Sequence, residues 1–129
     1  MPTFRKKEKL CSRKEINKLF REGKFFIIPP FKVFYFFSPL TDKVAPANIL
    51  FSVPVSYVKK AVLRNLLKRR LRESYRINKN FFYEYLTKNK THCTLSINYL
   101  SKEIADFNVI ELKIILILQR LIQEYETHN

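Results

Sequence analysis

The chain has 129 residues and carries 25 Lys and Arg against 11 Asp and Glu, a formal net charge of +14. Because 47% of the residues are hydrophobic and 15% aromatic, the composition excludes a disordered polyelectrolyte, and the length predicts one domain over residues 1–129. A single glycine excludes Gly-rich phosphate loops, and no apolar run is long enough to span a membrane. The charge predicts a polyanionic partner, either a nucleic acid or an anionic membrane.

The N-terminal region is predicted to be a flexible basic arm over residues 1–10, followed by a short helix. Ser12 and Glu15 have the spacing of a capping box, which marks the start of that helix. The helix is expected to run to Glu22, with Gly23 as a left-handed C-cap.

The next region is rich in β-branched and aromatic residues. Pro29 and Pro30 cannot both lie inside a paired ladder, so they predict a bend, and a strand is expected over residues 31–38. Residues 39–46 read as a loop, and residues 48–53 as a second strand. Alternation along the first strand places three side chains on one face: Lys32, Phe34 and Phe36.

A basic amphipathic helix is predicted over residues 56–76, with Ser56 as its N-cap. Its apolar half consists of Val62, Leu63, Leu66, Leu67 and Leu71. Its other half carries Arg64, Lys68 and Arg72 in line, flanked by Asn65, Arg69 and Arg76. Like charges at i,i+4 repel each other, and Glu73 is the only acid in the stretch, so this face is suited to a polyanion.

The C-terminal part is predicted to contain a short helix over residues 78–86 and a half-buried strand over residues 91–99. Asn108 and Glu111 form a second capping box, which is expected to open a long amphipathic helix. This order of elements predicts an α+β sandwich in which helices pack on one small sheet.

The side chains needed for autonomous RNA cleavage are scarce. His92 stands at a predicted strand start and His128 is penultimate, and no acidic cluster has metal-ligand spacing. We therefore expect no catalytic residue and no metal site in the protein. Cys11 and Cys93 are far apart in sequence and indicate thiols of a reducing compartment, so a cytoplasmic protein is expected. Three aromatic residues could stack on unpaired bases or simply pack in the core: Phe20, Phe34 and Phe36.

Residues 61–76 read AVLRNLLKRRLRESYR, and Phe51-Ser52-Val53 enters this helix as a strand. Together with Leu19-Phe20-Arg21-Glu22-Gly23 and Pro30-Phe31-Lys32-Val33-Phe34, they resemble the protein component of bacterial ribonuclease P. The resemblance covers residues 5–76 well and the remainder by order of elements. It implies a two-layer αβββαβα fold with a small mixed sheet and a left-handed βαβ crossover, of the kind found in domain 2 of ribosomal protein S5.

The resemblance also implies a function, which is removal of the 5′ leader from precursor tRNA as a subunit of the endoribonuclease. The chemistry would be carried by an RNA subunit with its Mg²⁺, and the protein would join it as a monomer in a 1:1 ribonucleoprotein, without a membrane or small-molecule partner. The residues that would face the RNA subunit are Lys59, Lys60, Arg64, Asn65, Lys68, Arg69, Arg72 and Arg76. A leader cleft would be formed by Ile16, Phe20, Lys32, Phe34 and Ser52.

The chain departs from the family pattern at a few positions, among them Leu66 after the Arg64-Asn65 pair, and Val55 and Ser56 after the strand. Two other readings stay open. A generic structural RNA-binding protein would have the same charge but no preference for a leader. An anionic-membrane binder would need the leucine face of the basic helix, which the core also requires.

Overall fold

A four-stranded mixed sheet is the centre of the computed structural model, which describes residues 3–41 and 45–127. The elements are η1 (Lys6–Glu8), α1 (Arg13–Glu22), β1 (Lys24–Ile28), β2 (Phe31–Pro39), β3 (Ala47–Ser52), α2 (Ala61–Asn78), α3 (Asn80–Lys88), β4 (Thr91–Tyr99) and α4 (Phe107–Thr127). None of the helices in this part of the chain combines the length and apolar character needed to cross a bilayer.

The strand order is β1-β2-β4-β3, so β1 and β3 are the two edges of the sheet. β2 pairs antiparallel with β1 and β4, whereas β3 and β4 run parallel. A parallel pair needs a long crossover connection, which α2 and α3 provide. The α+β fold with a small mixed sheet is therefore confirmed, and the left-handedness of the crossover stays a prediction.

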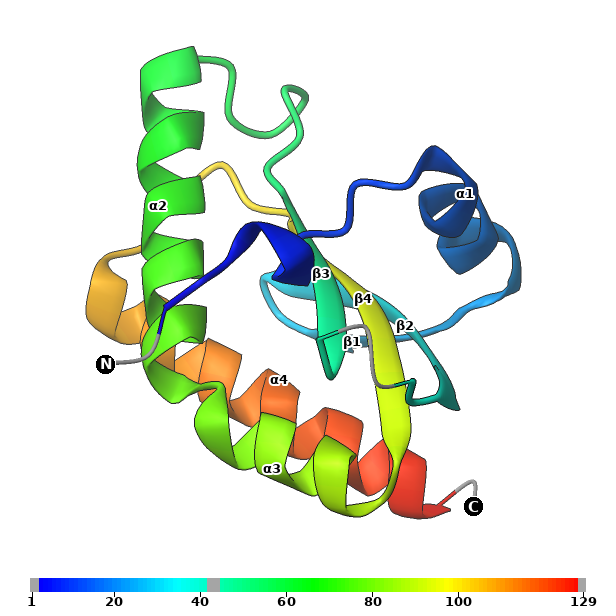
Figure 1. The fold of residues 1–129 in the computed structure, drawn as a ribbon. Coiled ribbons are helices and arrows are strands. Elements are labelled where there is room, and N and C mark those ends of the chain that lie inside the picture. The colour runs from blue at the N-terminus through cyan, green and yellow to red at the C-terminus, as the bar shows by residue number, and fades with distance from the viewer. Residues whose placement is uncertain (1–2, 42–44, 128–129) are drawn as a thin grey trace.

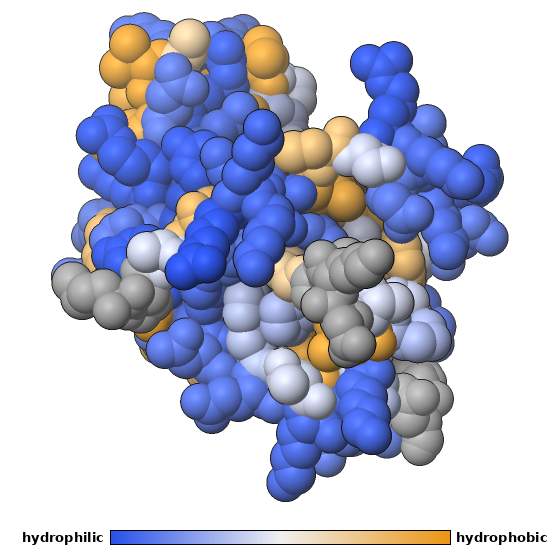
Figure 2. Space-filling view, viewed as in Figure 1, coloured by the Kyte–Doolittle hydropathy of each residue, from blue (hydrophilic) through white to orange (hydrophobic). Residues whose placement is uncertain are grey.

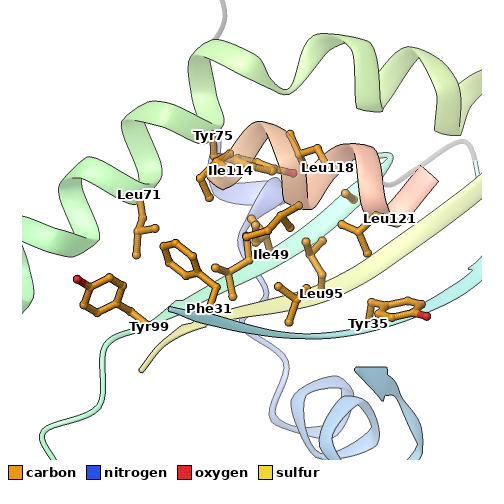
Figure 3. Close-up of a cluster of buried hydrophobic side chains, with 14 of the residues drawn as sticks. Phe31, Tyr35, Ile49, Leu71, Tyr75, Leu95, Tyr99, Ile114, Leu118 and Leu121 are labelled. Carbon is orange, nitrogen blue, oxygen red and sulfur yellow. The ribbon is translucent and has the colours of Figure 1, made fainter. Parts of the chain in front are cut away.

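One face of the sheet forms the hydrophobic core. Val33, Leu95 and Ile97 are fully buried there, under Leu71 of α2 and Ile114 of α4. Figure 3 shows Leu71, Leu95 and Ile114 in the space between the sheet and the helices. α1 lies on the other side of the sheet, away from α2, α3 and α4 (Figure 1). The two sides of the sheet thus have different partners: α2 and α4 cover one, and α1 lies over the other.

The residues before Pro29 form an additional strand rather than only a bend. Residues 24–28 pair with β2 across the Pro29-Pro30 turn, and Phe25 stands opposite Phe34. The predicted half-buried character of the 91–99 strand is wrong, because β4 is a central strand covered on both faces. Even Ser96, on the side facing away from the core, is fully buried.

The predicted start of the basic helix is also wrong. α2 begins at Ala61 and not after Ser56, because the N–H groups of Tyr57 and Val58 both bond to the Pro54 carbonyl in a turn that buries Val58. As a consequence Val62, which was predicted to lie on the apolar half of this helix, is in the first turn and is 78% exposed. α3 likewise begins later than predicted, at Asn80.

The cap of the last helix differs from the predicted capping box. α4 begins at Phe107, and the Asp106 carboxylate accepts a hydrogen bond from Val109 N at 3.0 Å. Asp106 rather than Asn108 is therefore the N-cap. In contrast, the predicted cap of α1 is confirmed, because Ser12 Oγ accepts a hydrogen bond from Glu15 N.

Gly23 is not a left-handed C-cap, because its φ is −71°. Its N–H closes the last turn of α1 on the Leu19 carbonyl at 2.9 Å. A Cβ at this position would collide with that carbonyl oxygen and lie 3.1 Å from the Tyr35 carbonyl. The glycine is needed for the close approach of α1 to β2, not for its backbone angles.

The flexible arm predicted for residues 1–10 stays a prediction, but residues 3–10 make specific contacts in the structure. Lys9 forms a parallel bridge with Ile49, and Leu10 N donates to the Ile49 carbonyl at 2.9 Å. The ring of Phe4 packs edge-on against Tyr75 at 5.9 Å. The segment therefore extends the sheet at the free edge of β3 and contacts α2.

Candidate nucleic-acid interface

The exposed side of α2 and the loop before it form a cationic face. We define this face by the predicted residues Lys59, Lys60, Arg64, Asn65, Lys68, Arg69, Arg72 and Arg76, all of which are exposed or half-buried. On the opposite side of the helix Leu67, Leu71 and Tyr75 are fully buried and hold it on the core. Figure 2 shows hydrophilic side chains covering the region of α2. The structure thus places the predicted residues on one accessible surface.

Three cations of α2 make neither an ion pair nor a side-chain hydrogen bond with any residue that the structure describes: Lys68, Arg69 and Arg72. Lys68 and Arg72 are one turn apart, so their charges repel each other in the free protein. An anion placed between them removes that repulsion, and Arg in particular offers a planar fork that matches phosphate oxygens.

The N-terminal segment, which was predicted only as a basic arm, adds Lys9 to this face. Lys9 lines a cavity of about 220 Å³ together with Lys68 and Arg72, and the aromatic rings of Phe4 and Phe51 form part of the same cavity. The cationic face therefore continues from α2 across this cavity to the edge of the sheet. Nothing in the local sequence around Lys9 shows this, because it depends on how residues 3–10 dock.

The remaining arginines of α2 have partners within the protein. Arg64 Nη1 donates to the carbonyls of Val58 at 3.0 Å and Lys59 at 2.7 Å, which ties the preceding loop to the helix. Arg76 pairs with Glu73, and this hydrogen bond lowers the pKa of Glu73. Arg70 donates to the Ala105 carbonyl at 2.6 Å. Arg64 and Arg76 thus have a structural role in addition to any role in binding.

The other predicted set lies on α1 and on the face of the sheet that α1 covers, and we keep the predicted name, the cleft, for this surface. The rings of Phe20 and Phe34 are 4.9 Å apart in an edge-to-face arrangement, and Phe20 remains 44% exposed. Ile16 lies one helical turn before Phe20 on the same side of α1. Lys32 and Ser52 lie in one row across the sheet, each opposite Asn98. In Figure 2 hydrophobic surface is visible between α1 and the sheet.

Lys32 has a defined position within this cleft. Its Nζ lies 5.1 Å from the centroid of the Phe34 ring and 4.5 Å from that of Phe25. A cation over an aromatic face is attracted by the ring quadrupole. Asn98 Nδ2 donates to the Lys32 carbonyl at 3.0 Å and so fixes the strand beneath it. Phe25 and Asn98 were not predicted, although pairing residues 24–28 with β2 in a hairpin would have placed Phe25 opposite Phe34.

His92 has the surroundings of a structural histidine. It is 8% exposed, its Nε2 lies 2.8 Å from Asn48 Oδ1, and burial lowers its pKa. Asn48 in turn donates to the Lys7 carbonyl at 2.7 Å, so the pair helps to hold the N-terminal segment. Within residues 3–41 and 45–127 no three His, Cys, Asp or Glu side chains come together as a metal site.

The sequences that this chain resembles all belong to one family. A family model described as Ribonuclease P matches residues 4–120. A ribonuclease P protein component of Porphyromonas gingivalis is 38% identical over 112 residues, which cover 85% of this chain and 81% of the relative. One of Borrelia duttonii is 35% identical over 105 residues, covering 81% and 82%.

Solved structures agree on the fold. The ribonuclease P protein of Thermotoga maritima superimposes with a TM-score of 0.66 at 25% identity, over 88% of this chain and 96% of that one. The Staphylococcus aureus ribonuclease P protein gives a TM-score of 0.65 at 16% identity, over 87% and 94%. At that lower identity the likeness concerns the fold alone.

Proposed function

The chain belongs to the bacterial ribonuclease P protein family, the protein component of a ribonucleoprotein enzyme that processes tRNA, and we propose that its two surfaces bind two different RNAs. The cationic face binds the catalytic RNA subunit. The cleft between α1 and the sheet binds the 5′ leader of precursor tRNA. In this arrangement the protein assists removal of the leader, and the bond chemistry belongs to the RNA.

The binding of the RNA subunit rests on Lys68, Arg69 and Arg72, which have no ion-pair partner among the described residues. Charged contacts of this kind go to phosphates and position a protein on folded RNA without reading its sequence. Mg²⁺ is expected to bind to the RNA partner, and the protein is proposed to join it as a monomer in a 1:1 complex. Asn65 is exposed and can both donate and accept hydrogen bonds, which suits a ribose 2′-OH.

The observation that carries leader binding is the Phe20–Phe34 ring pair with the Lys32 ammonium beside it. Aromatic rings next to cations are the elements with which proteins bind unpaired nucleotides, and each stacked base contributes about 1–3 kcal/mol. These residues lie on the face of the sheet opposite to the core that supports α2. A leader in the cleft and an RNA subunit on the cationic face can therefore bind at the same time.

The test is reconstitution of the protein with the RNase P RNA of the same organism. At low Mg²⁺, where the RNA alone is slow, addition of the protein should restore cleavage of a precursor tRNA at its mature 5′ end. In a matched reaction, a protein carrying Phe20→Ala and Phe34→Ala should restore less cleavage than the wild type, because it binds the leader more weakly. Failure of the wild-type protein to restore cleavage would refute the proposal and favour a generic structural RNA-binding protein.

A further inference from the structure

Phe25 is an aromatic residue whose exposure the core does not explain. It lies on the edge strand β1 and is 56% exposed, whereas its neighbour Phe26 points to the core and is 5% exposed. A large apolar ring left in water on an edge strand is unfavourable for the free protein and promotes association. A single exposed apolar residue is normal, whereas an exposed aromatic ring that belongs to a contiguous apolar patch is typical of a binding surface.

The ring of Phe25 continues the aromatic row of the cleft. Its centroid is 5.8 Å from that of Phe34, which in turn lies 4.9 Å from Phe20. The three rings come from β1, β2 and α1, so the row crosses from the helix to the outer edge of the sheet. Its outer end is at the opposite edge of the sheet from β3, which borders the cationic face.

The Lys32 ammonium is held between the two outer rings. It is closer to Phe25, at 4.5 Å, than to Phe34, at 5.1 Å, and it forms no ion pair within the part of the chain that the structure describes. The contact with Phe25 restricts a long side chain that would otherwise sample many rotamers. A cation is thereby kept at a fixed place beside an exposed ring.

We propose that Phe25 and Lys32 form an additional nucleotide subsite at the outer end of the cleft. The subsite takes one unpaired nucleotide of the leader, with its base on the exposed part of the Phe25 ring and its phosphate at Lys32 Nζ. Phe25 also acts as a positioning residue for Lys32. The inference rests on the proposed function of the cleft and adds a further nucleotide to the length of leader that the protein holds.

The experiment measures the affinity of the reconstituted holoenzyme for precursor tRNAs whose leaders are lengthened one nucleotide at a time. With the wild-type protein, affinity should rise in steps as each nucleotide reaches a ring. Phe25→Ala should remove one step, a loss of about five-fold or more from stacking alone. Leaders too short to reach β1, and mature tRNA without a leader, should bind Phe25→Ala and wild-type holoenzymes equally.

Three further variants test whether the effect of Phe25 comes from its aromatic ring, from its apolar volume or from a folding defect. Phe25→Leu keeps an apolar side chain but no ring and should lose the same step, whereas Phe25→Tyr should retain it. Ile27→Ala is the matched control, because Ile27 is 57% exposed on the same strand and stands opposite Lys32 without offering a ring. It should leave every step unchanged.

The outcomes distinguish the two levels of the proposal. If no holoenzyme prefers longer leaders, leader binding by the cleft is itself refuted. If Phe34→Ala removes a step but Phe25→Ala removes none, the additional subsite is refuted while the proposed function stands. Equal losses at all leader lengths and for mature tRNA would also overturn the subsite, because they indicate a general structural defect.

Discussion

Glu8 and Lys79 form an ion pair in which only 4% and 7% of their side chains are exposed. Lys79 caps both the end of α2 and the start of α3, and Glu8 belongs to the N-terminal segment. Tyr83 Oη donates to the same Glu8 carboxylate at 2.7 Å, and Lys79 also donates to the Thr3 carbonyl. The pair therefore fixes the N-terminal segment, and with it the side of the cavity that carries Lys9.

Loss of the Glu8 charge should destabilise the protein. Burial would raise the pKa of Glu8, but hydrogen bonds from Arg5 N, Lys79 and Tyr83 outweigh it and lower the pKa. We expect Glu8→Gln to reduce the free energy of unfolding by about 3–5 kcal/mol at pH 7, because Lys79 is left buried without its counter-charge. Urea unfolding measures this, and Glu8→Gln/Lys79→Met should be less destabilised than Glu8→Gln alone.

The same pair predicts a pH dependence. Since the pKa of Glu8 is lowered in the folded state, its stabilisation is complete above the unfolded value of about 4.3 and is lost as the pH falls through the folded value. The gap between wild type and Glu8→Gln should therefore close below about pH 4. A constant gap down to acid pH would show that the charge of Glu8 does not stabilise the fold.

Removing two cations from α2 should weaken binding of the RNA subunit and its salt dependence. Lys68→Gln/Arg72→Gln removes two side chains that we propose contact phosphates, so the slope of log K against log[salt] should flatten by about two. The control is Lys88→Gln/Lys102→Gln, which removes the same charge from exposed positions on α3 and the β4–α4 loop. Equal slopes for both double variants would mean that net charge, not the cationic face, governs binding.

Arg64 should stabilise the loop before α2 through its hydrogen bonds, in addition to contributing a positive charge to the cationic face. Arg64→Lys keeps the positive charge but cannot place one planar fork on the Val58 and Lys59 carbonyls. We expect faster amide hydrogen exchange at residues 57–60 and a lower Tm, with an unchanged salt slope. Arg69→Lys, at an exposed position without an ion pair or side-chain hydrogen bond to any described residue, should change neither quantity.

Gly23→Ala should disturb the cleft by moving α1. The added Cβ meets the Leu19 carbonyl and lies 3.1 Å from the Tyr35 carbonyl, so α1 must shift relative to β2. We expect a loss of about 1–3 kcal/mol in the free energy of unfolding, as for other overpacked sites, and weaker leader binding because Phe20 moves with the helix. Asn17→Ala, at an exposed position of α1, should leave both intact.

The sequence predicts best what depends on neighbouring residues. The Ser12 cap and the leucines that pack α2 against the core follow from local spacing, and both are found in the structure. The start of α2 could not be predicted, because it depends on the burial of Val58 by residues distant in sequence. Likewise Phe25 joins the cleft only through pairing with β2, and Lys9 joins the cationic face only through docking of the N-terminal segment. Long-range packing decides all three.

The proposal that the leader binds the cleft while the RNA subunit binds the cationic face is tested most directly by one ratio. It is the affinity of the holoenzyme for precursor tRNA divided by its affinity for mature tRNA, measured at saturating protein. The wild-type ratio should exceed one, Phe34→Ala should lower it by about five-fold or more, and Lys68→Gln/Arg72→Gln should leave it unchanged. A ratio of one for the wild type, or an equal fall in both variants, would contradict separate sites for the leader and the RNA subunit.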